Sequence, residues 1–420
     1  MSATRKTPDK AGQLRFKPYR AYKASGIEWL GEIPAHWEVK RIGDCAALTN
    51  DFPFDSQYFT KGIGIPLVRI RDLYGTETEI SYAGPVNGCA WIETGDQRMC
   101  CLRPRLGYDD GFIAYLLPTP LKVVNDLAFG TTVKHLSSND VSKIQFGVPP
   151  LIEQRAIRTF LDRQTSKIDE IVAKQEGLIE LLREKRAATI NRVVTQGLDP
   201  NVLTKDSGVE WLGEIPAHWG VKRLKHLARL NPESLGENTD PDLGITYVDI
   251  GGVDSLGRIT ERESLTFSSA PTRARRIVRD GDVVVSTVRT YLRAIAAIQD
   301  PGPHLVVSTG FTVVRPGDEL ITNYAAYALR TPYFVERVVA NSTGVSFPAT
   351  SEGRMATYEI AVPPEPEQRT IAAFLDRETA KIDGLMSRIS ACIERLKEYR
   401  KSLVFAAVTG KIDLRHKIVL

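Results

Sequence analysis

The sequence predicts a mixed α/β protein of the α+β kind, with two tandem α/β domains that are each followed by a long helix. Three features predict it: an internal repeat that spans most of the 420 residues, two helical segments of about 44 residues each, and strand-like runs before each helix. A hydrophobic content of 42% with 25% charged residues is ordinary for a globular chain, and the length suffices for two or three domain cores.

Two pairs of matching segments define the repeat. Residues 25–42 read SGIEWLGEIPAHWEVKRI and residues 207–224 read SGVEWLGEIPAHWGVKRL, 182 positions later. Residues 148–169 read VPPLIEQRAIRTFLDRQTSKID and residues 362–383 read VPPEPEQRTIAAFLDRETAKID, 214 positions later. The chain therefore uses one plan twice: a leading motif, a variable domain and a long helix.

Because the two displacements differ, the first variable domain is expected to be the shorter one. Residues 93–96 resemble residues 279–282, a displacement of 186, and Arg103-Pro104 resembles Arg315-Pro316, a displacement of 212. About 26 residues of the second copy, from Val283 to about Val307, are then without a counterpart. They read as two strands joined by a basic turn and a Pro-Gly-Pro loop, so the first domain is predicted to lack a hairpin.

The repeat also predicts the domain boundaries. They are a basic tail over residues 1–24, a first domain over 25–150, a long helix over 151–197, a linker over 198–206, a second domain over 207–364, a second long helix over 365–410 and a tail over 411–420. Residues 1–24 hold seven Lys or Arg and one Asp, a net +6, against +4 for the whole chain. Such a segment either binds phosphates or is a solvated, disordered start.

Each predicted helix follows a Pro-Pro pair, carries acidic residues in its first turn and stops at a glycine, Gly197 or Gly410. Apolar residues recur at alternating spacings of four and three, as in a coiled coil. The predicted seam of the second helix is Ile371, Leu375, Glu378, Ile382, Leu385, Ile389, Cys392, Leu396, Tyr399, Leu403 and Ala406. In the first helix it is Ile157, Leu161, Gln164, Ile168, Ile171, Gln175, Leu178 and Leu182.

Two helices of equal length, each after an equivalent domain, most simply pair as an antiparallel coiled coil with pseudo-twofold symmetry. About 44 residues correspond to roughly 65 Å of helix at about 1.5 Å per residue. The pair is then either a spacer of fixed length between the domains or a coiled coil that only holds them together. The equal lengths favour the spacer.

The sequence contains no phosphate-binding loop, dinucleotide-binding fingerprint, zinc-protease helix or nucleophile elbow. His36 and His218 recur inside Pro-Ala-His-Trp, where a structural histidine packed beside Trp37 or Trp219 is favoured over a duplicated site. The tryptophans of the leading motifs are expected to anchor cores rather than stack on bases. Five cysteines without a C-x-x-C pair indicate buried free thiols and no metal site. With no transmembrane run and no secretory signal, we expect a cytoplasmic protein.

The motif P-P-x-x-E-Q-R-x-I-x-x-F-L-D-x-x-T-x-K-I-D, present twice before long helices, resembles the specificity subunits of type I restriction-modification systems, over nearly the whole chain from about residue 16. The resemblance implies two target-recognition domains that each read one half of a bipartite site in double-stranded DNA. It also implies partners: modification (methyltransferase) subunits, two of them, and restriction (motor-nuclease) subunits. No membrane is involved.

The resemblance further implies a non-catalytic subunit with no cofactor of its own, because S-adenosylmethionine, ATP and Mg are expected on the partner subunits. Base-edge contacts require Arg, Lys, Asn, Gln or hydroxyl side chains on loops, and further cations meet phosphates. Any single such residue could instead be a solvated loop charge. The candidates for DNA contact are Arg69, Arg71, Thr131, Thr132, Lys134 and His135 in the first domain, and Arg273, Arg275, Arg276, Arg289, Tyr291, Arg293, Ser342, Thr343 and Ser346 in the second.

The predicted gap in the first domain removes the counterpart of the Arg289, Tyr291, Arg293 turn. The main alternative is therefore a degraded specificity subunit that acts as a partner-binding scaffold, with only the second domain reading DNA. A stand-alone methyltransferase or nuclease is disfavoured by the missing motifs.

Overall fold

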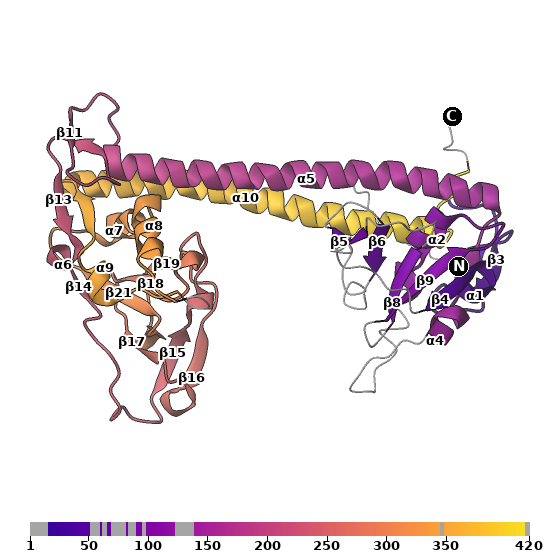
Figure 1. Ribbon diagram of the computed structural model, residues 1–420, viewed down its shortest axis with the longest axis horizontal. Helices are drawn as coiled ribbons and strands as arrows, with labels where there is room; N and C mark the ends of the chain where they lie inside the picture. Colours follow the sequence, from indigo (N-terminus) through magenta and orange to yellow (C-terminus); the bar gives the residue numbers. More distant parts are fainter. Residues whose placement is uncertain are drawn as a thin grey trace, which may run out of the picture. The chain divides into compact units, whose positions relative to one another are not determined.

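The computed structural model describes residues 16–50, 59–60, 65–68, 81–82, 90–94, 98–121, 138–344 and 348–415. The chain divides into two compact units. The first unit holds residues 1–176 and 389–420, and the second unit holds residues 177–388. Both units combine helices and strands, and α5 (Leu151–Gln196) and α10 (Glu365–Val408) are by far the longest elements (Figure 1).

The first unit is built mainly from one six-stranded sheet of order β4-β9-β8-β6-β7-β5, with the small pairs β1-β2 and β10-β3 beside it. Its other elements are α1, α2 and α4. The bounds are β1 Tyr22–Ala24, β2 Glu32–Pro34, β3 Glu38–Arg41, α1 Ile42–Cys45, β4 Ala46–Asn50, β5 Phe59–Thr60, β6 Ile65–Val68, β7 Ser81–Tyr82, β8 Ala90–Thr94, β9 Arg98–Pro104, α2 Asp110–Leu116, α4 Ser138–Lys143 and β10 Gln145–Val148.

The second unit has two four-stranded sheets, of orders β14-β21-β18-β19 and β16-β15-β20-β17, and the pairs β11-β12 and β13-β22. The strands are β11 Thr204–Asp206, β12 Glu214–Pro216, β13 Gly220–Arg223, β14 Ala228–Leu230, β15 Gly244–Val248, β16 Glu263–Thr266, β17 Ala274–Ile277, β18 Val283–Ser286, β19 Ile295–Ala297, β20 Leu305–Ser308, β21 Phe311–Pro316 and β22 Glu359–Val362. The helices are α6 Leu224–Leu227, η3 Ile250–Gly252, η4 Phe267–Ser269, η5 Thr290–Leu292, α7 Thr322–Ala328, α8 Pro332–Ala340 and α9 Glu352–Met355.

The strand registers show which segments of the two units correspond. Ala46 faces Pro104 between β4 and β9, and Ala228 faces Pro316 between β14 and β21. The predicted match of Arg103-Pro104 with Arg315-Pro316 is therefore confirmed. On the other side of the same strands, Leu102 faces Ala90 and Val314 faces Val283. Strand β8 thus lies beside β9 as β18 lies beside β21, and it also pairs parallel with β6, as β20 pairs parallel with β15.

This register corrects the predicted match of residues 93–96 with residues 279–282, which was wrong. Residues 93 and 94 lie in β8, whereas residues 279–282 precede β18. Ala90 and Leu102 are 12 positions apart, whereas Val283 and Val314 are 31 apart, so the connection from β8 to β9 is 19 residues shorter than the one from β18 to β21. The η5 turn, β19 and β20 lie between β18 and β21, whereas only residues 95–97 separate β8 from β9.

The shorter connection accompanies a different arrangement of sheets. In the second unit β18 pairs with β21 and β19 in one sheet, and β15 pairs parallel with β20 in the other. In the first unit β8 pairs with β9 on one side and parallel with β6 on the other. The strands from β4 to β9 that the structure describes therefore form one continuous sheet, where the second unit has two four-stranded sheets.

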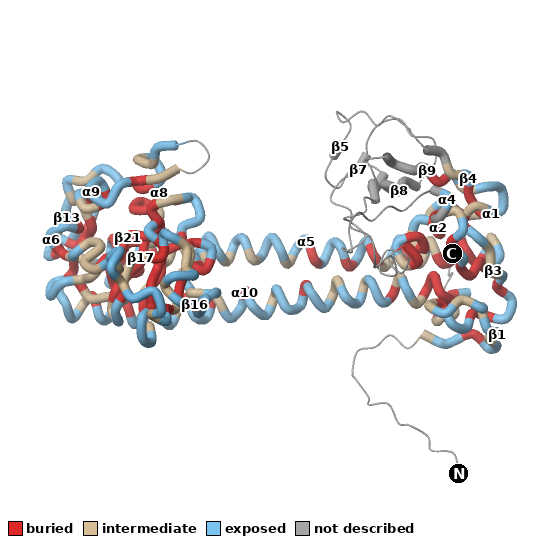
Figure 2. Tube along the Cα trace, turned by 90° about the horizontal axis from the view of Figure 1, so that it is seen from below, coloured by how far each residue is buried: buried red, intermediate tan, exposed pale blue. Residues whose placement is uncertain are grey.

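The core of each unit includes the end of a helix from the other half of the sequence (Figure 2). Leu403, Ala407 and Val408 of α10 are buried in the first unit with Trp37. Ile190, Val193 and Val194 of α5 are buried in the second unit with Trp219. Apolar burial contributes roughly 25 cal/mol per Å², so these helix ends stabilise the unit that they enter. The ends of the long helices therefore belong to the cores of the two units.

Three predicted linkers or tails are also parts of a folded unit. Tyr19 is buried and β1 pairs with β2, although residues 1–24 were predicted as a tail. Strand β11 of the predicted linker pairs with β12. Leu414 is buried in the first unit, where the Asp413 amide donates to the carbonyl of Lys17 at 2.8 Å. Residues 1–15, whose charge made a phosphate-binding arm conceivable, lie outside the described residues.

The buried seams of α5 and α10 differ from the predicted ones by one residue at alternate positions. In α10, Met386 and Ile393 are buried, whereas the predicted Leu385, Cys392 and Tyr399 are exposed. The same shift buries Val172 and exposes Ile171 and Leu178 in α5.

The shift arises at Thr165 and Thr379, which are buried and equivalent in the repeat. Each hydroxyl donates to the carbonyl four residues earlier, Leu161 or Leu375, at 2.8 and 2.7 Å. The buried seam includes these threonines. In α10 the buried residues Ile371, Leu375 and Thr379 are therefore spaced by four and four positions, where spacings of four and three were expected. A search for apolar residues at helical spacing misses such a threonine, which can be buried because its hydroxyl is hydrogen-bonded within its own helix.

The helices contact each other within both units. In the first unit Arg400 pairs with Asp169 at 2.8 Å, and Lys397 with Glu176 at 3.6 Å, so the two segments run in opposite directions. In the second unit Arg186 pairs with Asp383 at 2.9 Å. These two arginine–aspartate pairs are the same pair under the repeat, because 186 plus 214 is 400 and 169 plus 214 is 383.

Replacing Arg186 by alanine is expected to destabilise the second unit by about 2–3 kcal/mol, because it leaves the partner aspartate inside a largely dry contact. The side chain of Arg186 is 9% exposed, whereas that of Arg400 is 22% exposed and its partner Asp169 is 46% exposed. Arg400→Ala, the matched control, is expected to cost about 1 kcal/mol or less. Urea unfolding of both variants measures the difference, and equal losses would contradict it.

Candidate nucleic-acid interface

Each leading motif is fastened to its long helix through the glutamate of the EQR sequence. Glu153 is buried and accepts hydrogen bonds from the Tyr19 hydroxyl at 2.5 Å and the Trp37 indole N–H at 3.1 Å, and its other oxygen lies 2.7 Å from His36 Nε2. Glu367 likewise meets the indole of Trp219 at 3.0 Å and His218 Nε2 at 2.8 Å. The motif thus has a structural task in both units.

This geometry refines the roles predicted for histidine and tryptophan. The sequence showed no carboxylate cluster beside His36 or His218, yet each imidazole meets a carboxylate from 117 or 149 residues away. Trp37 and Trp219 are fully buried, in accord with a core anchor. Trp211 is partly exposed, with the Arg337 guanidinium 3.8 Å from its ring centroid.

The glutamine of the EQR sequence ties the helix start to the sheet region. Gln154 accepts from the Asp109 amide at 2.8 Å and donates to the Pro149 carbonyl at 2.8 Å. Gln368 accepts from the Ile321 amide at 3.0 Å and donates to the Pro363 carbonyl at 2.9 Å. These contacts satisfy backbone groups that would otherwise be orphaned at a helix start.

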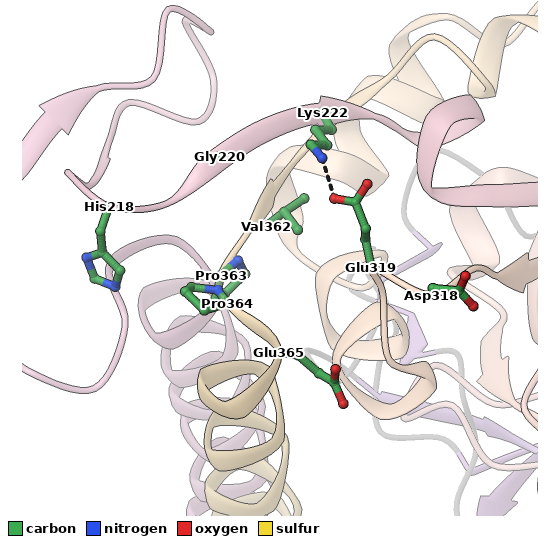
Figure 3. A pocket seen from close by; sticks show the side chains of 9 residues that line it. All are labelled: His218, Gly220, Lys222, Asp318, Glu319, Val362, Pro363, Pro364 and Glu365. Carbon is green, nitrogen blue, oxygen red and sulfur yellow. Dashed lines mark hydrogen bonds and ion pairs between the residues drawn. The ribbon is translucent and has the colours of Figure 1, made fainter.

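A shallow cavity of about 450 Å³ lies beside the start of α10 in the second unit (Figure 3). It is lined by His218, Gly220, Lys222, Asp318, Glu319, Val362, Pro363, Pro364 and Glu365. The Lys222 ammonium is bonded to Glu319, and the other charged groups include two carboxylates. A lining of this charge repels phosphate, so the cavity does not suit nucleic acid.

The predicted contact residues around Arg273 lie on and just before β17. Arg273 is exposed, but its guanidinium pairs with Asp249 at 2.7 Å and donates to the Tyr247 hydroxyl at 3.1 Å. Arg275 stacks over Phe267 at 4.6 Å. Arg276 is half-buried, and its Nε has no hydrogen-bond partner within the described part of the chain. Among these three, Arg273 and Arg275 offer the more accessible guanidinium faces.

Arg289, Tyr291 and Arg293 form a tight turn around η5. Arg289 and Arg293 both have φ of +53°, the left-handed region that costs a residue with a side chain about 1–2 kcal/mol. Between them the side chain of Thr290 is buried and contacts the Ser342 hydroxyl at 3.1 Å. Tyr291 and Leu292 are 57% and 37% exposed.

The structure brings these separate segments together at the turn between β20 and β21. The Thr309 amide donates to the Arg273 carbonyl at 2.8 Å, and the Thr287 amide donates to the Gly310 carbonyl at 2.8 Å. The Arg289 amide donates to the Pro348 carbonyl at 3.0 Å, and Thr343 pairs with Ala349. We call this surface the recognition edge; it comprises Arg273, residues 287–293, Thr309, residues 341–344 and residues 348–350.

Sequence reasoning missed one cation at the recognition edge. Arg354 of α9 is exposed, and its guanidinium donates to the carbonyl of Asn341 at 2.8 Å. Its position shortly after the loop of small and polar residues that begins at Asn341 was the sequence feature that could have indicated this cation. Thr343 is exposed, whereas Ser342 is half-buried and its hydroxyl donates to the Val338 carbonyl at 2.7 Å. Ser346 lies outside the described residues.

The candidate residues of the first unit cannot be placed in the same way. Arg69 and Arg71 follow β6, which forms where a strand was predicted, but both lie outside the described residues. So do Thr131, Thr132, Lys134 and His135.

Within the described residues no cluster of His, Cys, Asp or Glu has the arrangement of a metal site. The described helices include none that is long and apolar enough to cross a membrane. Cys45 is buried, as predicted, and burial raises the pKa of its thiol to about 11. Cys392 is exposed, contrary to the prediction, because of the one-residue shift of the seam.

Two equivalent tyrosines are expected to ionise late in an alkaline titration. Burial raises the pKa of Tyr115 and of Tyr327 to about 12, and each hydroxyl donates to a helix aspartate, Asp162 or Asp376. Because the pKa of each tyrosine in the folded protein lies above the ordinary value of 10, the neutral tyrosines stabilise the folded state fully below pH 10. This stabilisation is lost as the pH rises through 12. Tyrosinate absorbance should lose a late-titrating component in Tyr327→Phe, and an unchanged titration curve would refute this.

The comparisons with known proteins agree with this architecture. The family model of the type I restriction modification DNA specificity domain matches residues 90–181 and 217–395, more than half of the chain. The specificity subunit of the type I restriction enzyme EcoBI from Escherichia coli is 24% identical over 428 residues, covering 92% of this chain and 88% of that protein. The putative MjaX specificity subunit from Methanocaldococcus jannaschii is 21% identical, covering 96% and 99%.

Among solved structures, a chain from work on complex assembly and conformational transition of the type I R-M system shares the fold with a TM-score of 0.62. It is 18% identical, with 90% of this chain and 98% of that chain covered. The chain described here belongs to the family of type I restriction-modification DNA specificity subunits.

Proposed function

We propose that this chain reads a bipartite site in double-stranded DNA, one half with each unit, and directs partner subunits that carry out the chemistry. The observation that carries the proposal is the duplication of one set of contacts. The Trp–His–Glu cluster, the glutamine at the helix start and the arginine–aspartate pair occur once in each unit. A protein that repeats a whole reading unit is suited to a site with two halves.

The recognition edge is the proposed reading surface of the second unit. It gathers exposed arginines and hydroxyl side chains on loops held by main-chain hydrogen bonds, which is the chemistry that base edges and phosphates require. The antiparallel contacts between α5 and α10 support a coiled-coil spacer that fixes the separation of the half-sites. DNA as the substrate makes the cytoplasm the proposed place of action.

The proposed partners are two modification subunits and, for cleavage, restriction subunits. The repeat supports two equivalent partner sites, because the exposed Ile171 of the first unit corresponds to the exposed Leu385 of the second. An exposed apolar side chain at the same helix position in both units is consistent with a surface that another protein covers. Catalysis, with S-adenosylmethionine, ATP and Mg, belongs to these partners in the proposal.

A second function is favoured by the missing segment of the first unit. The connection from β8 to β9 is 19 residues shorter than the one from β18 to β21, and the described residues of the first unit include no counterpart of the η5 turn that carries Arg289, Tyr291 and Arg293. The chain would then be a partner-binding scaffold in which only the second unit reads DNA.

A methylome of cells that express this chain with its modification subunit tests both functions. Two separated half-sites around modified adenines support the bipartite reader. A single half-site indicates that only the second unit reads DNA. Full assembly with partners but no sequence-selective methylation, and only non-specific binding that falls steeply with salt, would refute DNA reading by either unit.

A further inference from the structure

The η5 turn presents two apolar side chains to solvent on a rigid frame. Tyr291 and Leu292 are exposed, whereas the large apolar residues of the adjoining strands, such as Val285 and Phe311, are buried. A turn that serves only to connect β18 with β19 gains nothing from exposing a tyrosine and a leucine side by side.

The frame holds this turn in a strained form. Arg289 and Arg293 adopt left-handed backbone conformations on either side of the exposed pair. Main-chain hydrogen bonds from a neighbouring segment hold the turn in this conformation. The Thr350 amide donates to the Thr287 carbonyl at 2.9 Å, and the Arg289 amide donates to the Pro348 carbonyl at 3.0 Å. Non-glycine residues in this conformation cluster at functional sites, where pre-organisation is part of the task.

Cationic residues flank the exposed pair. The side chains of Arg289 and Arg293 are exposed at the two ends of the turn, and the Arg354 guanidinium donates to the Asn341 carbonyl of the adjoining 341–344 loop. An apolar tip flanked by cations complements a polyanion that has an apolar interior, which is the description of duplex DNA. A protein partner would not require cations on both sides of the tip.

We propose that Tyr291 and Leu292 form a wedge that enters a groove and inserts at a base step of the half-site read by the second unit, with Arg289 and Arg293 on the flanking phosphates. The proposal rests on the proposed function of DNA reading and assigns a mode of reading to this edge. Insertion unstacks the step and bends the duplex, so sequence is read partly through deformability. The described residues of the first unit include no counterpart of this turn, so the proposal assigns the distortion to one half-site only.

The test uses the assembled complex of this chain with its modification subunits and a duplex carrying the site found in the methylome. 2-Aminopurine placed at successive steps of each half-site, other than the methylated adenines that the modification subunits flip out, reports unstacking as a rise in fluorescence. We expect a rise at one step in one half-site only, and loss of that rise with Tyr291→Ala. Affinity for the specific duplex should fall roughly 10- to 100-fold, since aromatic stacking contributes on that order.

The matched control is Leu203→Ala, which removes an exposed leucine of the same unit outside the strained turn and should leave fluorescence and affinity unchanged. Arg293→Gln should weaken binding to specific and unrelated duplexes alike and reduce the salt slope by about one. Selective binding without a fluorescence rise, or a rise that survives in Tyr291→Ala, would overturn the wedge and leave DNA reading intact. Absence of any selective binding would instead overturn the proposed function itself.

Discussion

Glu153→Leu is expected to destabilise the first unit by about 3–5 kcal/mol. The carboxylate is 6% exposed and satisfies the Tyr19 hydroxyl and the Trp37 indole, both of which belong to buried side chains. A leucine fills the space but leaves two buried donors unpaired, each costing about 1–3 kcal/mol. The variant should also lose stable assembly with partners near its lowered unfolding temperature.

The equivalent glutamate of the second unit provides the control. The side chain of Glu367 is 31% exposed and meets Trp219 and His218. Water can reach its partners, so Glu367→Leu should cost about half as much as Glu153→Leu. Glu153→Gln should recover part of the loss through its amide oxygen. Urea unfolding followed by tryptophan fluorescence measures all three, and a loss below about 1 kcal/mol for Glu153→Leu would show that the cluster contributes little.

Gly410→Ala is expected to destabilise the first unit by about 3 kcal/mol. The residue ends α10 with φ of +71°, and a Cβ there would overlap the Pro34 ring and approach the Trp37 ring to 3.2 Å. The left-handed conformation costs alanine about 1–2 kcal/mol, and displacing a proline of β2 from a packed core adds a similar amount.

Gly197→Ala separates these two contributions. Gly197 ends α5 with φ of +76°, but the nearest atom to its Cβ would be Trp219 at 3.3 Å, so little has to move. The expected loss is about 1–2 kcal/mol, close to the conformational cost alone. Thermal unfolding of both variants decides the matter. A loss in Gly410→Ala no greater than in Gly197→Ala would show that the contact with Pro34 is readily relieved.

The sequence correctly predicted where the two long helices begin and end, but it predicted the wrong residue at alternate positions of the buried seam. Proline pairs and glycines mark the ends of α5 and α10 because they act on the local backbone, and a local signal is readable from a single chain. Which face is buried depends on what lies against the helix. Thr379 is buried because Tyr327 contacts its hydroxyl at 3.2 Å, and no hydrophobic pattern contains that contact.

The prediction for the variable domains shows the same division. The repeat predicted that the first domain is shorter, because the two pairs of matching segments are displaced by different numbers of residues along the chain. Its position was misjudged, because residues 93–96 and 279–282 are alike in letters but not in register. Only the ladders of β8 with β9 and with β6 show that residues 93 and 94 lie in a strand, whereas residues 279–282 precede one.

The candidate DNA contacts were chosen as separate cations and hydroxyls, and the sequence alone could not place them on one surface. Arg273, Tyr291 and Thr343 meet at one edge because main-chain hydrogen bonds around Thr309 and Gly310 join three distant segments. The structure also separates Arg273, whose charge is matched by Asp249, from Arg293 at an exposed turn.

The sequence by itself determined the duplicated plan, the family, the two long helices and their ends, since these depend on repetition and on local backbone chemistry. The tertiary structure decided which helix face is buried, which strands correspond, and that each unit's core takes in a helix end from the other half of the chain. The physical reason is that burial, strand pairing and satisfied polar groups are set by contacts between residues far apart in sequence, such as Glu153 with Trp37.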